Sequence, residues 1–168
     1  EKIFCYSNKI KNFPDKYIGK IHVIPALLRK KFYDVTKSDG INDCINLLVI
    51  GGSQGAKIFD TLIKSSIIKL SKTYNLKIYQ QTNLTNFKEL KKLYNDQNID
   101  YELFDFNEDI SNLMSRSNIC ITRAGASTLA ELVFLNLPYV AIPLPTSKDN
   151  HQFENAFFYN EIACNWIL

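Results

Sequence analysis

The sequence has no apolar run long enough to cross a membrane, which takes roughly 18 to 20 residues. No secretory pattern opens the chain and the first residue is not Met, so we expect an excerpt of a longer protein. Its four cysteines lie far apart without metal-ligand spacing, which favours free thiols in a reducing cytoplasm. The net charge is only +3 and comes mostly from scattered lysines, so no nucleic-acid partner is expected.

Two common nucleotide-binding signatures are also missing from the glycine-rich turn at residues 51–57. Three residues rather than four separate its glycines and no Lys-Ser/Thr pair closes it, which excludes the phosphate loop of ATPases. The dinucleotide fingerprint is excluded because the glycine spacing differs and the next strand runs into residues 80–83, where no acidic residue stands. What remains is either a tight backbone cradle with Ser53 at its tip or an ordinary turn between a strand and a helix.

Apolar runs and helical patterns alternate along the chain from residue 46 onward. The predicted strands cover residues 46–50, 76–81, 100–104, 118–122, 139–142 and the final segment 164–168. The predicted helices cover the stretch after residue 50 to about 72, then 86–95, 110–116, 127–135 and 150–162. This alternation indicates an α/β fold, with a Rossmann-like parallel sheet covered by helices on both faces. Ligands of such sheets bind beyond the carboxyl ends of the strands, so the turns after the strands should share one rim.

The turn and helix start after the strand at 118–122 are the most informative about function. Gly125 and Ala126 would let a ligand approach the backbone closely. Ser127 and Thr128 can cap the helix, whose free N–H groups and dipole attract phosphate. Glu131, about one turn into the helix, is near enough to accept hydrogen bonds from sugar hydroxyls. We interpret these residues as a nucleoside diphosphate site, although strand–turn–helix units of α/β proteins in general share this pattern.

A third segment of interest, rich in polar residues, occupies the start of the predicted helix at 150–162. Capping explains Asp149 or Asn150 there, but it does not explain Gln152. Gln152 would face a cleft if the helix points its N-terminus toward one. His151 can equally be a solvent-exposed residue or a catalytic one.

Together these segments resemble the MurG family of bacterial glycosyltransferases. Members of that family transfer N-acetylglucosamine from UDP to lipid-linked muramyl-pentapeptide in peptidoglycan synthesis. The matching segments are residues 48–56, 106–109, 123–131, 137–138 and 149–156. The resemblance implies one half of an inverting enzyme with the GT-B architecture. Residues 43–168 would be its UDP-N-acetylglucosamine-binding domain, truncated at its C-terminus, and the weakly matching residues 1–42 an interdomain arm.

The resemblance also implies roles for individual residues around the donor. Ser53 would contact the nucleotide-sugar, and main-chain groups at Asn107 would read the uracil edge, so that its side-chain identity matters little. The N–H and hydroxyl groups at 126–128 would bind the pyrophosphate, Glu131 the ribose, and Gln152 the hydroxyls of N-acetylglucosamine. The expected substrate-binding set is Arg29, Ser53, Asn107, Ala126, Ser127, Thr128, Glu131 and Gln152, with Gly52, Gly125 and His151 as further candidates.

Two positions depart from the family pattern. Residues 25–29 stand where the family has Gly-Asn-Pro-Val-Arg near the domain junction, and only Arg29 is kept. His151 replaces a second Gln beside Gln152, in the sugar contact.

The resemblance places the rest of the reaction outside this chain. No catalytic residue is expected here, because the general base belongs to the missing N-terminal half, which would also bind the lipid-linked acceptor. No metal or other cofactor is expected, since the chain lacks the Asp-x-Asp pair of metal-dependent glycosyltransferases. The full enzyme would lie peripherally on the inner face of the cell membrane. Two alternatives are a binding module that needs a separate partner chain, as in the split transferase of eukaryotic N-glycan synthesis, and a degraded fragment without activity.

Overall fold

The computed structural model describes residues 1–7, 10, 13–37, 43–147, 150–160 and 163–168, without the side chains of residues 53–57. Its main sheet has six parallel strands in the order β5-β4-β3-β6-β7-β8. The strands are β3 (Ile45–Ile50), β4 (Leu76–Gln81), β5 (Asp100–Phe104), β6 (Ile119–Thr122), β7 (Tyr139–Ala141) and β8 (Asn165–Ile167). The connecting helices are α1 (Gly52–Leu62), α2 (Lys64–Ser71), α3 (Phe87–Asp96), α4 (Ile110–Arg116), α5 (Ala126–Phe134) and α6 (His151–Tyr159). The α/β fold with a parallel sheet predicted from the sequence is therefore confirmed.

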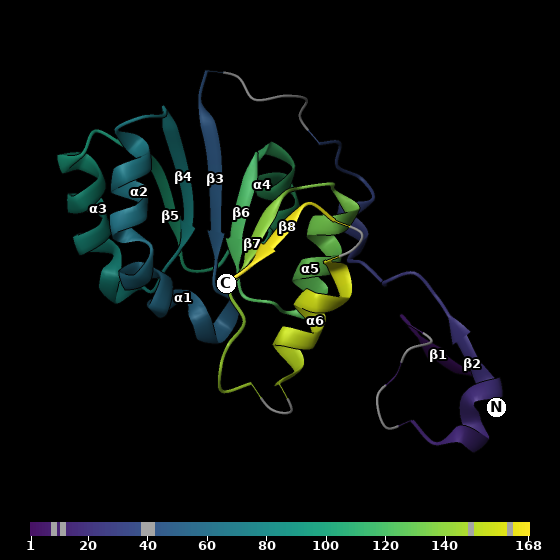
Figure 1. Cartoon of the computed structure of the whole chain (residues 1–168). Coiled ribbons are helices and arrows are strands. Elements are labelled where there is room, and N and C mark those ends of the chain that lie inside the picture. The colour runs from purple at the N-terminus through teal and green to yellow at the C-terminus, as the bar shows by residue number, and fades with distance from the viewer. Residues whose placement is uncertain (8–9, 11–12, 38–42, 148–149, 161–162) are drawn as a thin grey trace.

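Helices cover both faces of this sheet (Figure 1). The alternation of side chains along β3 sends Leu47 and Val49 to one face, where they pack with residues of α1, α2 and α3. Leu48 and Ile50 point to the other face and belong to the core shared with α4, α5 and α6. All four are nearly fully buried, as expected for a central strand of a parallel sheet.

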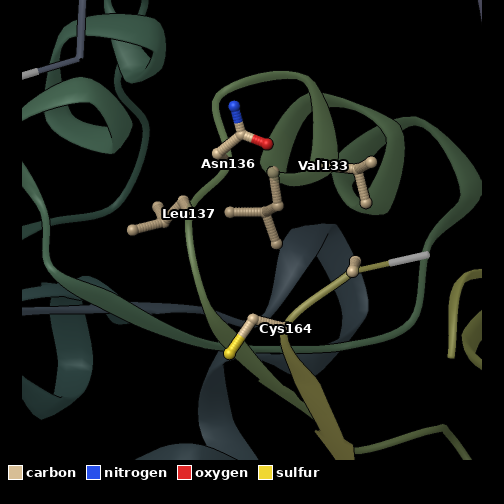
Figure 2. Close-up of a pocket in the computed structure, with 6 residues that line it drawn as sticks. Val133, Asn136, Leu137 and Cys164 are labelled. Carbon is tan, nitrogen blue, oxygen red and sulfur yellow. The ribbon is translucent and has the colours of Figure 1, made fainter. Parts of the chain in front are cut away.

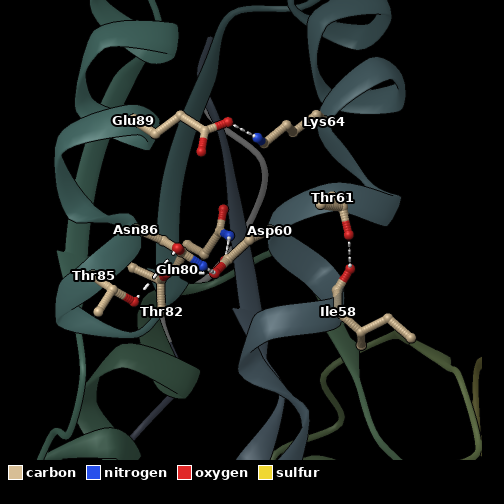
Figure 3. A network of polar contacts seen from close by, with 9 residues as sticks. All are labelled: Ile58, Asp60, Thr61, Lys64, Gln80, Thr82, Thr85, Asn86 and Glu89. Atoms are coloured by element: carbon tan, nitrogen blue, oxygen red, sulfur yellow. Dashed lines mark hydrogen bonds and ion pairs between the residues drawn. The ribbon is translucent and has the colours of Figure 1, made fainter.

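The predicted continuous helix from residue 51 to about 72 is wrong, because the chain breaks there into α1 and α2 at Ile63. No Pro or Gly stands at the break. Instead the hydroxyl of Thr61 donates to the carbonyl of Ile58 at 3.1 Å, a back-bond of the kind that bends helices (Figure 3). Ile63 at the break and Ile67 in α2 are both buried in the core.

A buried polar network ties α1 to the end of β4 (Figure 3). Asp60 is only 3% exposed. Its Oδ1 accepts from Gln80 Nε2 at 2.8 Å, and its Oδ2 accepts from Thr82 Oγ1 at 2.7 Å and Asn86 Nδ2 at 2.6 Å. Tyr94 in turn donates its hydroxyl to Gln80 Oε1, and burial raises the pKa of that phenol. Asn86 ends the 3-10 helix η3 (Leu84–Asn86), so one carboxylate joins three elements.

The N-terminal segment contains a short parallel pair, β1 (Ile3–Cys5) and β2 (Ile21–Val23), joined through the 3-10 helix η1 (Asp15–Lys20). This pair lies apart from the main sheet (Figure 1). A second 3-10 helix, η2 (Lys30–Phe32), returns the chain to the core, where Phe32 is 1% exposed and packs among residues of the α4–α5 side. The division of the chain into an arm up to residue 42 and a domain from residue 43 stays a prediction.

Among the described residues, no helix is both long and apolar enough to span a membrane. All four cysteines are free, and Cys120 is fully buried in β6, as expected for a structural thiol. Burial raises the pKa of the Cys120 thiol, so the group stays protonated and inert.

Candidate functional site

A cleft of about 290 Å³ opens at the carboxyl ends of β3, β4, β5 and β6. The three motif segments of the sequence meet there, as expected for turns that follow parallel strands. The lining residues are Arg29, Ile50, Gly51, Gly52, Gln81, Phe104, Phe106, Asn107, Ile110, Met114, Thr122, Arg123, Gly125, Thr128, Glu131 and Gln152. Of the predicted site residues, Ala126, Ser127 and His151 are exposed beside this lining, and the side chain of Ser53 lies outside the described part of the chain.

A second, smaller cavity of about 100 Å³ lies at the opposite end of the sheet, before β7 and β8 (Figure 2). Its wall is formed by Leu132, Val133, Asn136, Leu137, Ala163 and Cys164. Ligand sites usually measure about 300 to 1,000 Å³. The cleft of about 290 Å³ lies at the lower end of this range, whereas the second cavity of about 100 Å³ is far below it. The cleft at the carboxyl ends is therefore the candidate site.

The start of α5 forms one wall of the cleft. The helix begins at Ala126 with Gly125 as its N-cap, and no side chain caps it. The predicted capping role of Ser127 and Thr128 is therefore wrong, because these residues lie inside the first turn. Their N–H groups come before the first intrahelical donor, Leu129, whose N–H donates to the carbonyl of Gly125 at 3.0 Å, and they point out of the helix end. A Cβ placed on Gly125 would meet only Thr128 Oγ1, at 3.8 Å, so open space lies before this backbone.

Arg29 and Glu131 form a bidentate ion pair at the edge of this wall. Arg29 Nε donates to Glu131 Oε1 at 2.7 Å, and Arg29 Nη2 donates to Oε2 at 2.9 Å. The Glu131 side chain is 3% exposed, whereas that of Arg29 is 59% exposed. The guanidinium also lies 5.1 Å from the ring centroid of Phe32, whose burial anchors this part of the N-terminal segment. Arg29 thus reaches the cleft although the residues before it have lost the family's turn.

Arg123 is a cleft residue that the sequence interpretation did not single out. Its Nη1 donates to the carbonyls of Ile142 at 2.9 Å and Pro143 at 3.1 Å, and its guanidinium lies 5.2 Å from the Phe59 ring centroid. The residue is 7% exposed, and this burial lowers its pKa below the usual range for arginine. The signal that could have identified it is its position, directly after a buried strand. Arg123 joins the turn after β6 to the turn after β7.

The glycine-rich turn and the loop after β5 form the facing wall. Gly52 has a φ of +66°, which favours glycine, and opens α1, so that Ser53 is the second residue of the helix. In the loop after β5, Phe106 is 78% exposed. Asn107 uses its side chain locally, since its Oδ1 accepts from the N–H of Asp109 at 2.7 Å. Asn107 therefore shapes this loop through its side chain. The expectation that the identity of this side chain matters little does not account for this bond.

The start of α6 completes the cleft. Asn150 is the N-cap residue, with φ +54° and no side-chain capping bond, and the alternative cap Asp149 lies outside the described residues. Gln152 faces the cleft as predicted, and its Oε1 accepts from the N–H of Leu144 at 2.9 Å. This bond uses the amide oxygen and holds the Gln152 side chain at the lining of the cleft. His151 is exposed and does not line the cleft.

The chemistry of this cleft suits an anionic, polar ligand. Arg123 and the α5 helix start supply positive potential and N–H donors, while the charge of Arg29 is balanced by Glu131. Glu131 and Gln152 supply groups that bind hydroxyls. Within the described residues, no cluster of His, Cys, Asp or Glu side chains has the arrangement of a metal site.

Comparison with known proteins agrees with this geometry. The model of the glycosyltransferase family 28 C-terminal domain matches residues 46–167. A Pelagibacter ubique protein is 64% identical over 168 residues, which are 100% of this chain and 47% of the relative. It is named UDP-N-acetylglucosamine--N-acetylmuramyl-(pentapeptide) pyrophosphoryl-undecaprenol N-acetylglucosamine transferase.

Two solved structures resemble the chain. The crystal structure of Acinetobacter baumannii MurG is 27% identical with a TM-score of 0.73, over 95% of this chain and 44% of that one. The solution structure of ALG13 is 15% identical with a TM-score of 0.51, over 74% of this chain and 78% of that one, and shows a shared fold alone. The chain spans about half the length of the curated relatives it matches. The family model covers most of the chain, including the strands of the main sheet. The chain therefore belongs to glycosyltransferase family 28 and corresponds to the C-terminal domain of that family.

Proposed function

We propose that this chain is the donor-binding half of an inverting N-acetylglucosaminyltransferase. The donor would be UDP-N-acetylglucosamine, and the acceptor a muramyl-pentapeptide carried on pyrophosphoryl-undecaprenol, as in the name of the Pelagibacter relative. The observation that carries the proposal is the cleft at the carboxyl ends of the strands, which gathers the α5 helix start, Glu131 and Gln152. Each of these groups matches one part of a nucleotide-sugar.

The pyrophosphate would lie at the start of α5. The N–H groups at residues 126–128 and the Thr128 hydroxyl point to that end of the helix, where the dipole is positive. Glu131, one turn further on, would accept hydrogen bonds from the ribose. Exposed Phe106 and the backbone near Asn107 would contact the uracil on the facing wall, and Gln152 would donate to the sugar.

The reaction would be direct displacement at the anomeric carbon of the sugar, with inversion and departure of UDP. Negative charge grows on the leaving pyrophosphate, so fixed donors aimed at it stabilise the transition state more than the ground state. The start of α5 would supply these donors without a metal ion. The base that takes the proton from the acceptor hydroxyl would come from residues outside this chain.

The acceptor's lipid carrier also implies a place for the reaction. A transferase that acts on a lipid-linked sugar must meet it at a membrane surface. We therefore place the full enzyme on the cytoplasmic face of the cell membrane, held there peripherally.

Thermal melts of the 168-residue chain test donor binding directly. A ligand at about 100 times its dissociation constant adds roughly 2.7 kcal/mol to stability. For a chain of this size that corresponds to an increase in Tm of roughly 5 to 10 °C. Millimolar UDP should produce this shift, and ADP at the same concentration should produce a much smaller one. An unchanged Tm with UDP, for a chain shown to be folded by circular dichroism, would exclude the proposed site.

The second expectation concerns catalysis. We expect the 168-residue chain to bind the donor without transferring the sugar, because it spans about half the length of its transferase relatives. The measurement is transfer of radiolabelled N-acetylglucosamine to a lipid-linked acceptor, with a full-length relative as the positive control. Transfer by the chain alone would show that it contains the acceptor site and the base.

A further inference from the structure

One side chain, Gln81, joins the two sides of the facing wall of the cleft. Gln81 is the last residue of β4, and its Oε1 accepts from the N–H of Gly52 at 3.1 Å. Its Nε2 donates to the carbonyl of Asp105 at 3.0 Å. Gly52 belongs to the turn after β3, and Asp105 to the loop after β5. The amide is therefore a bridge between two segments that have no direct bond to each other among the described contacts.

The topology of the sheet makes this bridge possible. β4 lies between β3 and β5, so the carboxyl end of β4 is flanked by the ends of both neighbours. A side chain there needs a donor and an acceptor on one planar group to reach a backbone N–H on one side and a carbonyl on the other. Glutamine has both. The next residue adds a backbone bond, since the N–H of Thr82 donates to the carbonyl of Phe104 at 2.8 Å.

The N–H of Gly52 would otherwise be a free donor at the glycine-rich turn. This N–H donates to Gln81, so it is not free to bind a ligand. The turn therefore contributes its backbone shape to the cleft and not this donor. The Asp105 carbonyl is likewise held directly before Phe106 and Asn107, which line the cleft. Gln81 therefore links the glycine-rich turn to the 105–107 loop beyond the ends of the paired strands.

We propose that Gln81 is a positioning residue for the nucleobase of the donor, acting through the 105–107 loop. This inference rests on the proposed function, because it assumes that the base lies against that loop. A loop held in place discriminates between bases that differ at their hydrogen-bonding edge, whereas a loop that moves accepts both. Loss of the bridge should therefore lower affinity for UDP more than affinity for CDP.

The test is the substitution Gln81→Met, which keeps the length of the side chain and removes both polar groups. Loss of two hydrogen bonds of ordinary strength lowers the population of the loop conformation that binds the base. UDP affinity should therefore fall by about ten-fold in titration calorimetry. The ratio of UDP to CDP affinity should fall by about five-fold. The matched control is Gln97→Met, at an exposed position after α3, which should leave both affinities unchanged. Urea melts of each variant establish that the comparison is between folded proteins.

Hydrogen exchange of the Gly52 amide provides a readout that needs no ligand. We expect this amide to exchange about ten-fold faster in Gln81→Met than in the parent chain, and unchanged in Gln97→Met. If the parent chain binds no UDP, the proposed function fails while the exchange measurement still tests the bridge. If the parent binds UDP and the Gln81→Met variant keeps the same ratio of UDP to CDP affinity, Gln81 has no positioning role. An unchanged exchange rate at Gly52 would overturn the bridge itself.

Discussion

Replacing Glu131 with alanine is expected to lower UDP affinity by about ten- to a hundred-fold and to destabilise the fold by about 2 kcal/mol. The binding effect follows from the proposed ribose contact, because charge-assisted hydrogen bonds are worth roughly 1.5 to 3 kcal/mol. The stability effect follows from the ion pair with Arg29, whose two bonds of 2.7 and 2.9 Å are lost. Arg29 is 59% exposed and can be hydrated after the change, which keeps the stability loss moderate.

The same ion pair places a condition on nucleotide binding. Arg29 uses both carboxylate oxygens of Glu131, so ribose hydroxyls must either share these oxygens or displace the guanidinium. The two contributions of Glu131 can be separated with a double-mutant cycle that adds Arg29→Met. In the absence of ligand, the urea melts give the free energy of unfolding of each variant. The effects of the two substitutions on this free energy should not add, because each removes the same ion pair. In the Arg29→Met background, Glu131→Ala should still weaken UDP binding by at least ten-fold.

The control for this experiment is Glu89→Ala. Glu89 also forms an ion pair, with Lys64, but it lies on α3 away from the cleft and is 68% exposed. This variant should keep both UDP affinity and stability within about 0.5 kcal/mol of the parent. If Glu131→Ala loses stability but keeps the parent's UDP affinity, the ribose is not at Glu131. The placement of the nucleotide over α5 would then be wrong as well.

The sheet and most of its helices were predictable from the sequence because their signals are local. β4, β5 and α4 have the predicted bounds to the residue, since short apolar runs and helical spacing are read within a single window. The break at Ile63 was missed because it carries no Gly or Pro. It coincides with the back-bond from the Thr61 hydroxyl to the carbonyl of Ile58, which does not change the hydrophobic pattern of the sequence.

The position of the cleft was also predictable, but its internal bonds were not. Parallel strands bring the turns after them to one rim whatever the side chains are. By contrast, the partner of Glu131 is 102 residues away in the sequence, and no local pattern joins the two. The start of α5 was misread for a related reason. Ser127 and Thr128 are good capping residues, but the backbone of Gly125 takes the N-cap position and moves both into the helix.

Replacing Asp60 with alanine should lower the free energy of unfolding by about 3 to 4 kcal/mol, the largest stability effect that we expect from a single substitution here. The carboxylate accepts from Gln80, Thr82 and Asn86, and the first two of these residues are fully buried. Its removal leaves their donors without partners in a place that water does not reach. A buried donor without a partner costs roughly 1 to 3 kcal/mol, and the bond from Tyr94 to Gln80 transmits the disturbance to α3.

The conservative variant Asp60→Asn distinguishes hydrogen bonding from packing. It keeps the shape of the side chain but presents an NH₂ group to at least one of the three donors, so an intermediate loss of about 1 to 2 kcal/mol is expected. Urea unfolding followed by circular dichroism measures both variants, with Asp96→Ala at the exposed end of α3 as the control. A loss below about 1 kcal/mol for Asp60→Ala would mean that the three donors find other partners. In that case the network would not hold α1 against β4, and the glycine-rich turn at the start of α1 would have to be fixed by other contacts, among them the bond from Gly52 to Gln81.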